Sequence, residues 1–146
     1  MMSFWDFFRE KNKYVYHGSP RQDLILIESR ISTHGREWVY AAKDPVMAAL
    51  FVRRYGGDMT CQISRTQKGM PQVKEKYRGA LDERYASGGG SIYKLSGMDF
   101  FEGQTSWSDD FVSEKKVDVF KEFKINNALD HLLKLESEGK LIILRK

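Results

Sequence analysis

Alternation of apolar and polar positions runs through most of the chain and predicts many short strands. The clearest run is 117–125, where apolar and polar side chains alternate at almost every position. The predicted strands cover residues 14–17, 23–27, 37–42, 58–65, 91–95, 110–113, 117–125 and 140–144. Many short strands with a few scattered helices predict an α+β fold with a mainly antiparallel sheet.

Residues 45–55 carry apolar side chains at helical spacing and clear signals at both ends, and they predict a helix. Asp44 is a favoured N-cap, Pro45 suits the first helical position, and Gly56 can take the left-handed turn that ends a helix. The predicted inward face carries Ala48, Phe51, Val52 and Tyr55. Arg53 and Arg54 then suit the negative end of the helix dipole.

Two further helices are predicted. One covers residues 127–138, with Asn126 or Asn127 as the N-cap and Gly139 at its end. Its inward positions are Leu129, Leu132 and Leu133. The other is an N-terminal helix within residues 1–12, capped by Ser3, whose aromatic side chains are available to pack on the domain.

Length and composition predict one domain, residues 1–146. Hydrophobic residues make up 41% of the chain and charged residues 30%, which is typical of a globular protein and not of a disordered one. The polar stretch 66–90 ends in three glycines, so we expect a flexible insertion there, with a short helix near 80–86 and a possible use as a lid.

Charge and residue counts narrow the classes of function. The net charge of +4 suits an anionic ligand or a nucleic-acid partner. Cys61 is the sole cysteine, so no internal disulfide forms, and we interpret it as a small apolar filler. Three histidines without metal-ligand spacing predict no metal. The sequence shows no leader and no apolar run of about 20 residues, so we expect a cytoplasmic protein with no membrane partner.

Candidate chemistry begins at Tyr14–Pro20, a strand-forming run that ends in a polar turn. We expect His17 to stand at the end of this strand and face a cleft instead of filling the core. Gly18 would then let a ligand approach the backbone closely. The alternative is a histidine that only bonds the turn.

Three stretches together resemble the ADP-ribosyltransferase fold, in the branch with the signature His, Tyr and Glu that includes poly(ADP-ribose) polymerases and diphtheria-type toxins. They are Tyr16-His17-Gly18-Ser19, the strand and helix from Tyr40 to Phe51, and the acidic pair before Val112-Ser113. The likeness is closer to small uncharacterised bacterial and phage proteins of that fold. It is spread over residues 14–120, and about twenty positions carry it. It implies a split, mainly antiparallel sheet with short flanking helices.

The resemblance also implies how NAD would bind. His17 would bond a ribose hydroxyl, and the backbone of Gly18, next to Ser19, would hold the nicotinamide carboxamide. Tyr40 and Ala42 match the family's second motif, and Phe51 falls where an aromatic stacks on nicotinamide in the polymerase-like members. One departure is Ala48, which stands where some members bond the carboxamide with a serine. Tyr40 and Phe51 could instead be core aromatics.

The acidic residue is the second departure from the family pattern. The resemblance points to Asp110, with Asp109 beside it, although Asp is one methylene shorter than the family's Glu. Glu114 could take the role if the strand register shifts by a few residues. The carboxylate would orient the nicotinamide ribose and stabilise the positive charge that develops as nicotinamide leaves. The alternative is a solvated strand end.

These observations leave three functional hypotheses. The first is an NAD-dependent mono-ADP-ribosyltransferase acting on an unknown protein or nucleic acid. The second is a domain of the same fold without activity that binds NAD, ADP-ribose or a partner. The third is a basic nucleic-acid-binding module, supported by Arg53, Arg54, Lys74, Lys76, Arg78 and Arg84. The third lacks the stacking aromatics that we would expect between these basic residues.

Overall fold

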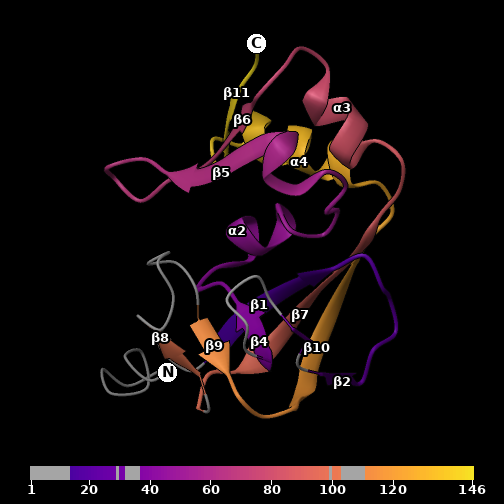
Figure 1. The fold of residues 1–146 in the computed structure, drawn as a ribbon, viewed down its shortest axis with the longest axis vertical. Helices are drawn as coiled ribbons and strands as arrows, with labels where there is room; N and C mark the ends of the chain where they lie inside the picture. The colour runs from indigo at the N-terminus through magenta and orange to yellow at the C-terminus, as the bar shows by residue number, and fades with distance from the viewer. Residues whose placement is uncertain (1–13, 29, 32–36, 99, 103–110) are drawn as a thin grey trace. The chain divides into compact units, whose positions relative to one another are not determined.

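The computed structural model describes residues 14–28, 30–31, 37–98, 100–102 and 111–146. The chain divides into two compact units, each described by itself below (Figure 1). The first unit takes its described residues from Met1–His17, Asp23–Pro45 and Tyr93–Glu122, and the second from Gly18–Gln22, Val46–Ile92 and Phe123–Lys146. The helix expected within residues 1–12 lies outside the described residues.

The strands of the first unit belong to two four-stranded sheets. One has the order β1-β7-β10-β2, formed by Tyr14–Ser19, Gly90–Ser96, Val117–Ile125 and Leu26–Ile27. The other has the order β3-β4-β9-β8, formed by Arg30–Ile31, Glu37–Ala41, Phe111–Ser113 and Phe101–Glu102. The boundaries between the units fall inside β1, β7 and β10.

The core of the first unit follows the period of two along its strands. Neighbouring side chains on a strand point to opposite faces, so every second residue can be buried. Val39 and Ala41 of β4 are buried in this way, as are Tyr93 and Leu95 of β7. The buried cluster consists of Val15, Ile27, Val39, Ala41, Tyr93, Leu95, Phe100 and Val117.

The second unit contains a three-stranded sheet in the order β11-β6-β5, formed by Ile142–Leu144, Pro71–Glu75 and Cys61–Arg65. Its helical elements are α2 (Pro45–Ala49, of which Pro45 belongs to the first unit), the 3-10 turn η1 (Gly57–Met59), α3 (Ala80–Tyr85) and α4 (Ala128–Ser137). β5 and β6 are antiparallel, whereas β6 and β11 are parallel. The predicted α+β class, with mainly antiparallel strands and short helices, is confirmed.

Two elements match their sequence signals closely. β10 has the predicted bounds Val117–Ile125. α4 begins after Asn127, whose side-chain oxygen accepts a hydrogen bond from the backbone N–H of Asp130 at 3.0 Å, and Gly139 follows it with a φ of +74°. A side-chain cap at one end and a left-handed glycine after the other explain why both ends could be read from the sequence.

The helix predicted over residues 45–55 is too long. α2 ends at Ala49, and the chain then tightens into i→i−3 hydrogen bonds, such as Phe51 N–H to the Ala48 carbonyl at 3.0 Å. Tyr55, predicted to face inward, is 61% exposed. The side chain of Arg54 bonds backbone carbonyls of the fold instead of complementing a helix end.

The prediction of a loop over residues 66–90 is also wrong, apart from the short helix near 80–86, which is α3. β6 runs through this stretch and pairs with a strand on each side. Val73 in β6 and Leu81 in α3 are buried. Exposed polar residues between the buried positions hid β6, because a strand with one buried face needs only a few apolar residues.

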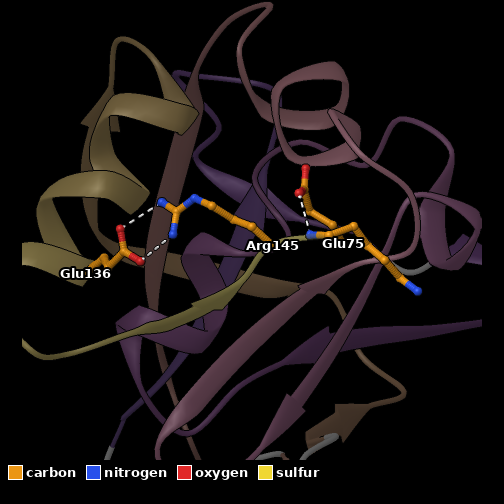
Figure 2. Close-up of polar contacts among 4 residues, drawn as sticks. Glu75, Glu136 and Arg145 are labelled. Atoms are coloured by element: carbon orange, nitrogen blue, oxygen red, sulfur yellow. Dashed lines mark hydrogen bonds and ion pairs between the residues drawn. The ribbon is translucent and has the colours of Figure 1, made fainter.

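Two carboxylates hold the last described residues in the second unit (Figure 2). Glu136, on α4, forms a two-pronged ion pair with Arg145, at 2.8 and 2.9 Å. Glu75, at the end of β6, accepts from the backbone N–H of Lys146 at 3.2 Å and from that of Leu81, in the first turn of α3, at 2.8 Å. Gly79 gives α3 no side-chain cap, so Glu75 supplies one from another element.

A pH effect on stability is expected from His131 on α4, whose ring centroid lies 5.8 Å from that of Phe123. Burial, and then the positive charge of Lys134, lower the pKa of His131 below its usual 6.5, against a smaller opposing effect of Glu138. The unfolded chain therefore binds a proton here first as the pH falls, and the free energy of unfolding decreases below about pH 6.5. Denaturant unfolding at pH 8 and pH 5 should show that the free energy of unfolding falls less on acidification in His131→Gln than in the wild type. An equal fall in both proteins would contradict this.

Among the described residues, the helices are all too short or too polar to cross a membrane.

Candidate functional site

The strand β4 is the meeting point of the stretches singled out in the first unit. Ala42, directly after β4, forms an antiparallel bridge with Tyr16 of β1, with hydrogen bonds of 2.7 and 2.8 Å. β4 also pairs with β9, so that Tyr40 lies opposite Val112. The first motif, on β1, and the Val-Ser strand, β9, thus both meet the β4 segment although they are far apart in the chain.

His17 is brought to Tyr40 by this arrangement. Its Nδ1 lies 2.6 Å from the backbone carbonyl oxygen of Tyr40, and a carbonyl only accepts, so Nδ1 carries the proton. In the neutral ring Nε2 is then an acceptor. The side chain is only 6% exposed, and β1 continues to Ser19, so the expectation that the strand ends at His17 is corrected.

Tyr40 has an unusual hydroxyl group. The oxygen is buried, and it has no hydrogen-bond partner among the described residues. The ring lies edge-on to that of Trp38, with centroids 6.1 Å apart. A buried hydroxyl without a partner costs free energy, and such groups occur where a ligand, a water or an unusual function completes the bonding.

The acidic candidates lie before and after β9 (Phe111–Ser113) in the sequence. Asp109 and Asp110 lie outside the described residues. Phe111, the first residue of β9, pairs with Ala41, whereas Glu114 follows Ser113, which pairs with Val39. Glu114 is exposed. The start of β9 is therefore next to the β4 residues that meet β1, and Glu114 comes after the opposite end.

Gly18 and Ser19 belong to the second unit together with Ala48 and Phe51. A Cβ on Gly18 would clash with the Ala48 carbonyl oxygen and would lie 3.2 Å from the Phe51 carbonyl carbon. Gly18 is therefore needed for close packing on the backbone of α2 and the turn after it. Ser19 is buried, and its Oγ accepts from the Arg21 N–H at 3.1 Å, which stabilises the turn.

Arg54 is the residue that sequence reasoning missed. Its Nη2 donates to the Gly18 carbonyl at 2.7 Å, and its Nε donates to the Phe51 carbonyl at 3.1 Å. Phe51 itself is half-buried. The expected helix to residue 55 concealed this role, and no local signal in the sequence distinguishes Arg54 from Arg53.

The described residues give less support to a cysteine nucleophile or a metal site. Burial raises the pKa of the Cys61 thiol, and Arg84 opposes this only in part, so the thiol stays neutral and is a poor nucleophile. Its complete burial confirms that it fills the core. Within the described ranges no three His, Cys, Asp or Glu side chains gather in a group that could hold a metal ion.

The chain was compared with protein-family models, with curated proteins and with solved structures, and no match was found in any of the three.

Proposed function

We propose that the protein binds NAD and transfers its ADP-ribose part to a macromolecule. The observation that carries the proposal is the meeting at β4: His17 bonds the backbone of Tyr40, and Tyr40 pairs with Val112 in the strand that follows the acidic residues. His17, Tyr40 and Val112, one residue from each of the three stretches that resemble the family's motifs, therefore lie next to one another in the first unit. The Tyr40 hydroxyl, which has no hydrogen-bond partner among the described residues, is a second support, because it suits a polar ligand.

Each residue has a defined task in this mechanism. Nε2 of His17 accepts a hydrogen bond from a ribose hydroxyl, since Nδ1 is held by the Tyr40 carbonyl. Tyr40 contacts the nicotinamide ring. The resemblance points to Asp110 as the acid, which lies outside the described residues, and Glu114 is the alternative.

The reaction breaks the bond between the ribose C1 and the nicotinamide nitrogen. Both electrons of that bond leave with nicotinamide, which departs as a neutral base, and the ribose becomes an oxocarbenium-like cation. The carboxylate stabilises this charge. A nucleophile of the acceptor then forms the new bond to C1, and its proton passes to solvent.

Release of nicotinamide from NAD tests the proposal. His17→Asn is the sharpest variant, because an asparagine amide can still donate to the Tyr40 carbonyl but has no atom in the place of Nε2. We expect Asp110→Asn to slow release by about 100-fold or more, with Glu114→Gln as the matched control near wild-type rate. His17→Asn should weaken NAD binding.

The outcomes separate the candidates. NAD binding without any nicotinamide release would favour the inactive binder of the same fold. Wild-type protein that neither binds NAD nor releases nicotinamide would refute the proposal. If Glu114→Gln loses activity and Asp110→Asn keeps it, the assignment of the acid is wrong, but the transferase is retained.

A further inference from the structure

The outward face of the sheet β1-β7-β10-β2 carries a group of aromatic and charged side chains in the first unit. Val15 of β1 and Leu95 of β7 lie in the buried cluster on the inner face. Neighbouring residues on a strand point to opposite faces, so Tyr14 and Lys94, one position earlier in each strand, point outward. Phe120 of β10 is 63% exposed, and its ring contacts both of these side chains.

The rings of Tyr14 and Phe120 meet across β7, over the side chain of Lys94. β7 lies between β1 and β10, which places those two strands about 10 Å apart, yet the ring centroids are only 5.1 Å apart. The Lys94 ammonium lies 4.1 Å from the Tyr14 centroid and 5.7 Å from that of Phe120. Both distances allow cation–π attraction. The chain's own lysine thus shows that this aromatic pair attracts a cation.

Two carboxylates accompany Phe120 on the same face of β10. Asp118 and Glu122 are two residues away in either direction, at a spacing of about 7 Å along the strand. Asp118 is exposed and forms no ion pair with any described residue, whereas Glu122 accepts from the Asp23 N–H at 2.9 Å. In the described part of the first unit, the outward positions of β1, β7 and β10 therefore hold two carboxylates and a single amine. In a chain of net charge +4, this face is locally acidic.

We propose that this face, made of Tyr14, Lys94, Asp118, Phe120 and Glu122, docks an arginine-bearing segment of a partner protein. A guanidinium is planar, so it can stack on the exposed Phe120 ring while its fork of donors binds the Asp118 carboxylate. The two carboxylates would repel the phosphates of a nucleic acid, and this charge pattern selects a basic partner. The inference goes beyond the proposed function and does not depend on NAD binding.

Fluorescence anisotropy with a labelled arginine–serine repeat peptide tests the proposal. The same peptide with citrulline in place of arginine keeps the shape and removes the charge. We expect saturable binding of the arginine peptide that weakens with added salt, and no binding of the citrulline peptide.

Variants of the face should change this binding in both directions. Phe120→Leu should weaken it about fivefold, as for the loss of one exposed cation–π contact, whereas Phe120→Tyr keeps a ring and should bind as wild type. Asp118→Asn should weaken it about threefold. Lys94→Met should strengthen it, because it removes a competing cation. Phe101→Leu is the matched control, since Phe101 is 61% exposed but lies on β8 of the other sheet, and its affinity should be unchanged.

Several results would overturn the proposal. They are no binding of the arginine peptide to wild-type protein, equal binding of the citrulline peptide, and unchanged affinity in both Phe120→Leu and Asp118→Asn. An equal loss in Phe101→Leu would show an unspecific effect and would also overturn it. Tighter binding of an oligothymidylate, lost in Lys94→Met, would assign the face to single-stranded nucleic acid instead. Failure of NAD binding would leave the proposal standing.

Discussion

Replacing Gly89 by alanine is expected to lower the free energy of unfolding by about 3 kcal/mol, in the range for overpacking against atoms that cannot yield. A Cβ there would clash with the Ile125 carbonyl oxygen and would come within 2.7 Å of the Asn126 carbonyl oxygen. Both are backbone atoms, so relief requires moving the end of β10 or the approach to α4. Gly90 has the same problem with the Ser19 carbonyl oxygen.

Gly88 provides the control from within the same glycine triplet. A Cβ on Gly88 would meet only the Arg53 side chain, at 3.5 Å or more, which is ordinary contact. Gly88→Ala should therefore leave stability unchanged or raise it by about 0.5 kcal/mol through the unfolded chain. Urea unfolding of the variants measures both effects. Equal stability of Gly88→Ala and Gly89→Ala would show that the triplet is a spacer with no packing requirement.

The second large effect is expected at Glu75. Replacing Glu75 by glutamine should cost about 2 kcal/mol, because the amide nitrogen of glutamine donates and therefore cannot accept from both N–H groups that the carboxylate holds. Those N–H groups belong to Leu81 and Lys146, and Glu75 is only 5% exposed. Loss of the charge also removes a favourable interaction at the first turn of α3.

Glu136→Gln is the matched control for this prediction, since it also breaks a carboxylate contact to the last residues (Figure 2). The side chains of Glu136 and Arg145 are partly exposed, at 32% and 49%, so the loss of their ion pair should cost less than about 1 kcal/mol. Guanidinium unfolding at pH 7 compares the two. A Glu136→Gln variant less stable than Glu75→Gln would contradict the role given to burial.

The sequence predicted the fold where local signals and burial agree. Val117–Ile125 alternates strongly, and Asn127 and Gly139 mark the ends of α4, so these elements were found almost to the residue. β6 was missed because Val73 is its only large apolar residue among polar neighbours. Its pairing with β5 and β11 joins residues far apart in the chain, and no local pattern within residues 66–90 predicts it.

The residues of the candidate site were likewise predicted only in part. The strands that carry His17 and Tyr40 could be read from their motifs, and the structure brings both residues together. The partner of His17 could not be predicted, because it is the backbone of another strand and the sequence does not encode which carbonyl will face the ring. Arg54 was overlooked for a similar reason: its bonds go to carbonyls, which every residue has.

The most direct test of the NAD-binding claim follows His17 itself. In protein labelled with ¹⁵N in its histidines, NAD should shift the Nε2 resonance of His17 in a saturable way while Nδ1 stays protonated toward Tyr40. His131, on α4, serves as the internal reference and should not move. A His17 signal unchanged at NAD concentrations that saturate binding, or a shift confined to His131, would contradict the account.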